Sequence, residues 1–262
     1  MSHDAPTAGC VRAPARFSRR PGGAVTEASE QLGLSTVGPV FPRALGDGFE
    51  RLHPMMQRRF GVSLDARYAC IGRGVMTRVR RGPWWTVPFL QVGRLRNILI
   101  PDVGSDVPFT IENHAYLDPF GRETVTFVRE YRVPGRRRVS RFDATMVIDP
   151  RRGTVVDYLG THQHLAVDLG LTVEPDGSLL LRSGTQRFRE GWIDFRFPML
   201  FSGYAELREG FDEDSGVYRV KLEVRNRVFG FLFGYEGWFT CEFPEAPAVP
   251  RHVLPKRHES RY

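Results

Sequence analysis

Arg129 is the side chain in this sequence whose position most directly suggests chemistry. It falls in step with the apolar positions of residues 125–133, as does Tyr131, so a strand there would point the guanidinium toward its apolar side. A charge on that side needs a partner or a polar cavity. Glu206 or Asp194 would supply a structural ion pair, and a β-bulge that turns Arg129 outward is a second alternative. The functional interpretation is an anchor for a ligand carboxylate or phosphate, which arginine binds bidentately.

Glu112 and His114 suggest a different chemistry, because they share the second face of the strand expected at residues 107–117. Side by side they could act as an acid–base pair, although a polar solvent face explains the same pattern. His162 and His164 also share a strand face, but a metal needs a third and usually a fourth ligand. No spacing in the sequence supplies those ligands. We therefore expect two solvated histidines at a strand start, and no metal or other cofactor.

The densest aromatic segment spans residues 228–239 and contains three glycines. Glycine within a strand permits a sharp bend or the close approach of another backbone or a ligand. Two interpretations stay open: a glycine-rich hairpin whose aromatic rings fill a core, or the aromatic wall of a ligand cavity. The candidate ligand-binding residues are thus Arg129, Glu206, His114, Glu112, Tyr131, Tyr235 and Trp238.

The elements that would position these side chains are mainly strands. From about residue 106 to residue 243, apolar residues alternate with polar ones, and turn signals rich in Gly, Pro and Asp recur at short intervals. This pattern is typical of antiparallel strands joined by hairpins. Roughly nine or ten strands with one apolar face must hide their edges or close on themselves. We predict a mainly β fold (α+β by count): a large antiparallel sheet curled into a closed or partly open barrel, with one or two N-terminal helices packed on it.

Two segments have the apolar spacing of helices. Residues 41–60 form the first, and Pro54 should kink or restart it. Residues 83–99 form the second, with Trp84 and Trp85 on its apolar side. We expect this second helix to be buried on the sheet, with a lid over a cavity mouth as the alternative. Residues 69–79 between the two segments are predicted to form a strand.

The chain divides into three parts. Residues 1–36 are rich in Ala, Pro, Gly, Ser and Arg without periodicity, and predict a disordered N-terminal tail. Residues 37–244 form a single β-rich domain, and residues 245–262 form a Pro/Arg-rich C-terminal tail. The three cysteines are far apart in the sequence and fit neither a disulfide framework nor a zinc ligand set. With no export signal after the arginines at positions 19 and 20, these features predict a cytoplasmic protein.

The net charge of +7 bears on partners. Its arginines are scattered rather than clustered as a binding footprint would be, so no nucleic acid is expected. No run approaches the roughly 18 apolar residues of a transmembrane helix, which leaves weak contact with a membrane surface. The oligomeric state is not determined by these patterns.

Several short motifs resemble a known family. They are residues 41–49 (FPRALGDGF) with Leu52-His53-Pro54, residues 122–124 (RET) leading to Arg141-Phe142, and residues 225–230 (RNRVFG) with residues 234–237 (GYEG). In combination they resemble the bacterial domain of unknown function 4166, over about residues 38–244. The resemblance implies a domain that occurs alone or after a dehydrogenase-like nucleotide-binding domain. It implies no catalytic residues, because the family has no established activity.

These patterns favour a protein that binds a hydrophobic or amphipathic small molecule inside the barrel. Sites of that kind are mostly apolar with a few placed polar groups. One alternative is an enzyme acting on a lipid-like or polyketide-like substrate, which would bring Glu112, His114, Arg129 and Glu206 together. The other is a non-catalytic interaction module that partners an oxidoreductase, with a filled core and an exposed apolar patch.

Overall fold

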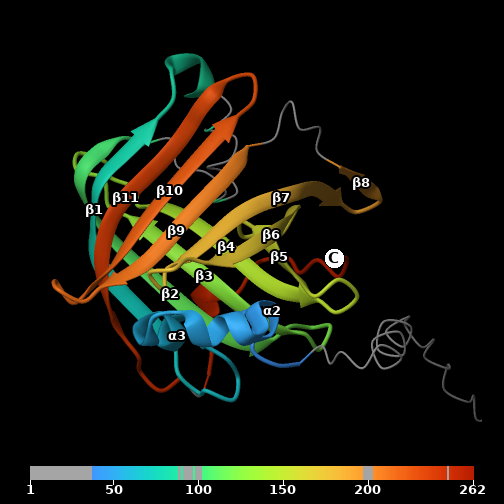
Figure 1. The fold of residues 1–262 in the computed structure, drawn as a ribbon. Coiled ribbons are helices and arrows are strands. Elements are labelled where there is room, and N and C mark those ends of the chain that lie inside the picture. The colour runs from blue at the N-terminus through green and yellow to red at the C-terminus, as the bar shows by residue number, and fades with distance from the viewer. Residues whose placement is uncertain (1–36, 88–89, 91–96, 98–101, 197–202, 247) are drawn as a thin grey trace, which may run out of the picture.

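A computed structural model describes residues 37–87, 90, 97, 102–196, 203–246 and 248–262 of the chain. The N-terminal tail expected at residues 1–36 lies outside these residues. In the described part, eleven antiparallel strands form one sheet in the order β6-β5-β4-β3-β2-β1-β11-β10-β9-β7-β8. A further pairing of β6 with β7 closes ten of these strands into a barrel, and β8 extends from its edge (Figure 1). The predicted mainly β fold with a closed barrel is confirmed.

Short connections separate most of the eleven strands. The strands are β1 Cys70–Arg81, β2 Gly104–Leu117, β3 Glu123–Tyr131, β4 Ser140–Asp149, β5 Thr154–Leu159, β6 Leu165–Val173, β7 Leu179–Glu190, β8 Ile193–Arg196, β9 Tyr204–Asp212, β10 Val217–Asn226 and β11 Gly230–Glu242. Closure removes the free edges that an open sheet of this size would expose to other chains.

The alternation of side chains separates an apolar interior from an outer face. In β2, Phe109 and Ile111 belong to the main core cluster. Their partners across the ladder in β3 are Tyr131 and Arg129. Successive residues of a strand point to opposite faces, so Arg129 shares the inward face with Tyr131. The register therefore places the guanidinium inside the barrel, and no bulge turns it outward.

Two short helices close one end of the barrel, α2 (Val40–Leu45) and α3 (Pro54–Phe60), with the 3₁₀ helix η1 (Gly46–Arg51) between them (Figure 1). Pro54 begins α3 at the first helical position, where its missing N–H costs no hydrogen bond, and the side chain of His53 caps that end. Phe41 and Met56 reach the main core cluster. The predicted restart at Pro54 is confirmed.

The second predicted helix is mostly outside the described residues. Described there are a 3₁₀ turn, η2 (Trp84–Thr86), and a few single residues, of which Leu90 is buried in the main core cluster. The side chains of Trp84 and Trp85 are 78% and 54% exposed, so the expectation that both pack on the sheet is wrong. The turn begins three residues after the end of β1, and the proline before it has an extended backbone.

The C-terminal segment, residues 248–262, lies against the outer face of the barrel. Val147, Val156, Tyr158 and Ala166 point outward from β4, β5 and β6 and form a second apolar cluster, against which Tyr262 packs. The Tyr158 hydroxyl donates to the Arg261 carbonyl at 2.6 Å. Apolar side chains that point outward are shielded from water only where another segment covers them, and residues 248–262 cover these.

Removing the Tyr158 hydroxyl should loosen that segment. Tyr158→Phe deletes the bond to the Arg261 carbonyl at a cost of about 1 kcal/mol. We expect trypsin to cleave after Lys256 about fivefold faster, because cleavage there follows the population of the undocked segment. Tyr116→Phe is the matched control, since this buried phenol bonds to Thr126 and touches no residue of the segment through its hydroxyl. Equal cleavage of both variants would contradict the docking role of Tyr158.

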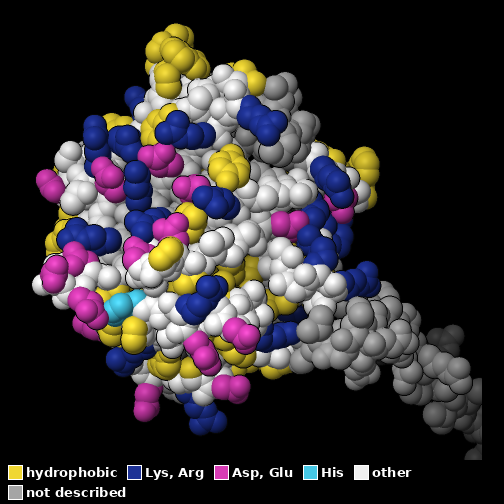
Figure 2. All heavy atoms as spheres, in the orientation of Figure 1, with side chains coloured by type: hydrophobic (Ala, Val, Ile, Leu, Met, Phe, Trp, Pro, Cys, Tyr) yellow, Lys and Arg dark blue, Asp and Glu magenta, His cyan; other side chains and the backbone are white. Residues whose placement is uncertain are grey.

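Positively and negatively charged side chains are interspersed over the outer surface. Figure 2 shows Lys and Arg side chains interspersed with Asp and Glu over the visible face. Many of them are paired, as in the contacts of Arg152 and Arg187 with Asp168 at 2.7–3.0 Å. No helix in the described residues is long and apolar enough to cross a membrane.

Candidate functional site

Four polar side chains converge inside the barrel and are called here the Arg129 cluster: Arg129, Tyr131, Asp157 and Tyr235. They come from β3, β5 and β11. The rings of Tyr131 and Tyr235 lie 5.4 Å apart, centroid to centroid. The charge of Arg129 acts on both phenols and on the Asp157 carboxyl. Three elements distant in sequence thus place one cation, one carboxyl and two phenols in a shared region.

Every member of the Arg129 cluster has a polar atom with an unmet hydrogen bond. Among the described residues, Arg129 Nη1, Asp157 Oδ1 and the hydroxyls of Tyr131 and Tyr235 are buried and have no partner. The four side chains belong to residues that are 6% exposed or less. Buried polar groups in native proteins nearly always have a partner, and each exception needs an explanation, such as a bound water, ion or ligand.

Aromatic rings surround the guanidinium of Arg129. Its central carbon lies 5.4 Å from the ring centroid of Phe127 and 5.0 Å from that of Phe142. Such cation–π contacts partly compensate a desolvated charge but do not satisfy N–H donors. The ring faces hold the guanidinium in place and leave Nη1 available to an acceptor.

Burial changes the protonation of the cluster. It raises the pKa of Asp157 to about 7, even though the charge of Arg129 and a backbone hydrogen bond from Thr145 lower it. Burial also raises the pKa of Tyr131 and of Tyr235, so both phenols remain neutral donors near pH 7. The cluster therefore offers a fixed cation, two hydroxyl donors and a carboxyl that is about half protonated at neutral pH.

A second group lies closer to the helices and is called the Arg59 cluster: Arg59, Cys70, Asn113, Glu209 and Cys241. Arg59 extends from α3 and forms a buried, bidentate ion pair with Glu209 of β9. Its Nη1 also donates to Asn113 Oδ1 at 2.9 Å and to Cys70 Sγ at 3.3 Å. Burial lowers the pKa of Arg59, but the charge of Glu209, those of Cys70 and Cys241 and the hydrogen bond to Glu209 together outweigh it, and the net pKa lies well above the usual value. This pair fixes α3 to the barrel wall.

The anionic partners expected for Arg129 lie elsewhere. Glu206 is on the outer face of β9, because its neighbour Leu207 packs on the core, and it pairs with Arg182 at 2.9 Å. Asp194 is in β8, outside the ring of ten strands, and lies 3.4 Å from Arg189 and from Arg261. The predicted ion pairs of Arg129 with Glu206 or Asp194 are therefore wrong.

Of the two aromatic candidates in β11, only one faces the interior. Tyr235 is buried in the core and Trp238 lies on the outer face, because an odd spacing in a strand reverses the side. Placing Trp238 with Tyr235 in one cavity wall was wrong. Val228 and Phe229, also expected to contribute, are exposed at the β10–β11 turn.

Glu112 and His114 form a pair on the outer face of β2, as their alternation predicted. His114 Nε2 lies 3.4 Å from Glu112 Oε2, which is also 3.0 Å from His252 Nε2 of the C-terminal segment. Burial lowers the pKa of His114, although Glu112 raises it. This pair is separated from Arg129 by the barrel wall, so the four residues proposed for catalysis do not meet at one site.

His162 and His164 stack on each other, with ring centroids 5.6 Å apart. His164 is only 6% exposed, and its Nδ1 lies 2.6 Å from Glu190 Oε2. The expectation that both histidines are solvated is therefore wrong for His164. No group of three potential metal ligands was found among the described residues.

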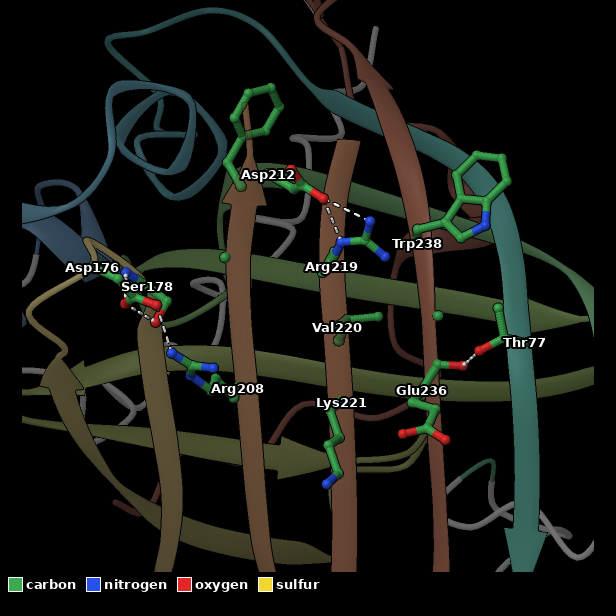
Figure 3. A pocket seen from close by; sticks show the side chains of 13 residues that line it. Thr77, Asp176, Ser178, Arg208, Asp212, Arg219, Val220, Lys221, Glu236 and Trp238 are labelled. Atoms are coloured by element: carbon green, nitrogen blue, oxygen red, sulfur yellow. Dashed lines mark hydrogen bonds and ion pairs between the residues drawn. The ribbon is translucent and has the colours of Figure 1, made fainter. Parts of the chain in front are cut away.

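Two hollows lined by described residues lie on the outer face. The larger, of about 410 Å³, is bordered by Trp238, Thr77 and a row of charged side chains (Figure 3). Most of the charges there have partners: Arg219 pairs with Asp212, and Arg208 with Asp176, each at 2.6 Å. The smaller hollow, of about 330 Å³, includes Glu206. Neither of these two includes Arg129.

Sequence reasoning missed three of the interior polar residues. Asp157 was detectable, because it alternates with Val155 and Leu159 as Arg129 does with its own neighbours. Arg59 was also detectable, because it follows the apolar Met56 by three residues, and that spacing puts both side chains on one side of a helix. Glu209 was detectable in the same way as Asp157, because it alternates with Leu207 and Phe211.

The fold and these interior residues define a closed antiparallel β-barrel domain whose core contains buried charges. The chain belongs to the family described as "Domain of unknown function (DUF4166)", whose model matches residues 52–239. It is also similar to the "Uncharacterized protein YndH" of Bacillus subtilis (strain 168), with 29% identity over 198 residues, covering 76% of this chain and 95% of that relative. The family resemblance of the sequence motifs is confirmed.

Proposed function

We propose that the barrel binds an amphipathic small molecule with an acidic head group, held by the Arg129 cluster. The observation that carries this proposal is the convergence of four buried side chains with unmet hydrogen bonds. A carboxylate or phosphate would accept from Arg129 Nη1 and from the two phenols, and a protonated Asp157 would donate a further bond. An acidic ligand would therefore complete all four groups at once.

The surroundings of the cluster suit an apolar tail. Phe109, Ile111, Phe142, Met146 and Leu222 belong to the same core cluster. Ligand sites are mostly apolar, with few polar groups that fix orientation. An amphipathic ligand would therefore find apolar contacts next to the polar groups, which a simple inorganic anion could not use.

Arg129→Leu should sharply reduce binding of such a ligand. A hydrogen bond to a charged group contributes about 1.5–3 kcal/mol, so the Kd should rise about tenfold to a hundredfold. The measurement is titration with a fluorescent long-chain fatty acid, with the corresponding fatty alcohol as a probe without the acidic group. The alcohol should bind both proteins alike.

Arg182→Leu is the matched control, because Arg182 is an exposed arginine paired with Glu206 on the outer face. Its Kd for the fatty acid should equal that of the unmodified protein. The unfolding midpoint of Arg129→Leu should not fall, since the change removes an incompletely paired buried charge. An unchanged fatty-acid Kd in the folded Arg129→Leu protein would refute the anchor role.

A further inference from the structure

We infer that Cys70 and Cys241 form a dithiol that peroxide oxidises to an intramolecular disulfide. The two residues are 171 positions apart in the sequence, yet their sulfurs lie 3.2 Å apart. An S–S bond is about 2.05 Å long, so each sulfur needs to move by roughly half an ångström or slightly more. The proposal is independent of the ligand proposed for the Arg129 cluster.

The barrel register explains how the thiols meet. Cys70 begins β1 and Cys241 lies near the end of β11, and these first and last strands pair with each other. The residue opposite Cys241 is Gly72, two positions from Cys70, so the cysteines are diagonal neighbours on one face. Barrel closure therefore creates the pair, and neither cysteine approaches the other by local chain geometry.

The surroundings favour a thiolate on Cys70. The hydrogen bond between the two sulfurs lowers the pKa of Cys70; burial opposes this shift, and the charge and Nη1 donor of Arg59 add to it. The pKa of Cys241 is raised, first by its bond to Cys70 and then by burial. The two thiols thus have separate parts: Cys70 as nucleophile and Cys241 as the resolving thiol.

The oxidant of suitable size is hydrogen peroxide. Cys70 is fully buried and Cys241 is half-buried, so a bulky disulfide would reach Cys70 poorly, whereas peroxide is little larger than water. The Cys70 thiolate attacks one peroxide oxygen, the O–O bond breaks, and hydroxide leaves and takes up the proton that Cys70 released. Cys241 sulfur then attacks the sulfenic sulfur of Cys70, the S–O bond breaks, and the leaving hydroxide takes the Cys241 proton. Two thiols and one peroxide thereby give one disulfide and two waters.

The disulfide would join the two strands that close the barrel. It would link positions 171 residues apart, and cross-links that enclose long loops restrict the unfolded chain most. Oxidation should therefore raise the midpoint of thermal unfolding, and dithiothreitol should reverse the rise.

The test uses the full chain with Cys10→Ser, so that Cys70 and Cys241 are the remaining thiols. Reduced protein is treated with hydrogen peroxide, alkylated under denaturing conditions, digested and analysed by mass spectrometry without reductant. We expect a cross-linked Cys70–Cys241 peptide that disappears after dithiothreitol. Alkylation of both cysteines after peroxide, or disulfides between chains, would overturn the proposal.

Two further variants test which thiol reacts first. In Cys10→Ser/Cys241→Ser, dimedone added together with denaturant after the peroxide step should trap sulfenic acid on Cys70, because Cys70 is buried in the folded protein. In Cys10→Ser/Cys70→Ser, Cys241 should react at least about tenfold more slowly, since burial raises its pKa and its sulfur lies farther from Arg59 Nη1 (4.0 Å) than that of Cys70 does (3.3 Å). Equal oxidation rates of Cys70 and Cys241 in these two variants would overturn the assignment of Cys70 as the nucleophile. The cross-linked peptide is measured in protein that keeps both cysteines, so a folding defect of the serine variants does not affect that result.

Discussion

Glu209→Gln is expected to destabilise this protein by about 3–5 kcal/mol, because it leaves the Arg59 guanidinium buried without a counter-charge. Arg59 and Glu209 have side chains that are 0% and 4% exposed, so water cannot replace the lost partner. Asn113 and Cys70 would remain as the hydrogen-bond partners of Arg59. The free energy of unfolding, measured by urea denaturation, provides the test.

Glu206→Gln is the matched control on the same strand. Glu206 also pairs with an arginine, but the side chains of Glu206 and Arg182 are 46% and 48% exposed. Exposed ion pairs contribute about 0–1 kcal/mol, so this variant should unfold at nearly the same urea concentration. Similar losses of unfolding free energy in the two variants would show that burial does not make the Arg59–Glu209 pair more important than the Arg182–Glu206 pair.

A double variant separates the buried charge from the packing of α3. Arg59→Met with Glu209→Leu removes both charges and keeps apolar volume. We expect it to be more stable than Glu209→Gln, because replacing both partners avoids an uncompensated charge. If the double variant were less stable than the single one, the contacts of α3 rather than the charge balance would dominate at this position.

Asp157→Asn is expected to stabilise the protein, and more strongly at high pH. Burial raises the folded-state pKa of Asp157 to about 7, against about 3.9 in an unfolded chain. A carboxyl with a raised folded pKa favours folding at low pH, and this contribution is lost as the pH rises toward 7. The asparagine variant has no such loss. The unfolding free energy of Asp157→Asn should exceed that of the unmodified protein at both pH values. This excess should be about 2–3 kcal/mol larger at about pH 8 than at about pH 5.

The measurement is urea denaturation of both proteins at the two pH values. Other groups titrate equally in the two proteins, so the difference between them isolates Asp157. Asp47→Asn, at an exposed position of η1, controls for the loss of one carboxylate. A difference between Asp157→Asn and the unmodified protein that does not change with pH would contradict a buried, ionising Asp157.

The same titration predicts the direction of ligand binding with pH. Below about pH 7, Asp157 is protonated and Arg129 retains its positive charge for an acidic ligand. Above that pH, the Asp157 carboxylate acts on Arg129 in competition with the ligand. Affinity for a fatty acid should therefore weaken as the pH rises through 7, and Asp157→Asn should reduce this dependence.

The sequence by itself determined the strands and their inward faces. Alternation in residues 125–133 placed Arg129 on the apolar side, and the pairing of Arg129 with Ile111 confirms it. The helix restart at Pro54 was also predictable, because proline fixes its own backbone angle and lacks a donor. These features depend on local conformation and on a period of two or 3.6 residues, which a single chain segment contains.

Tertiary structure alone decided which side chains meet. Glu206 was a reasonable partner for Arg129 by charge, yet it lies outside the barrel, and Asp157 occupies the interior position instead. The cysteines appeared unrelated, yet closure of β1 on β11 brings their sulfurs to 3.2 Å. Such contacts depend on strand order, ladder register and closure. These arise from the packing of the whole sheet, so the alternation within one strand does not contain them.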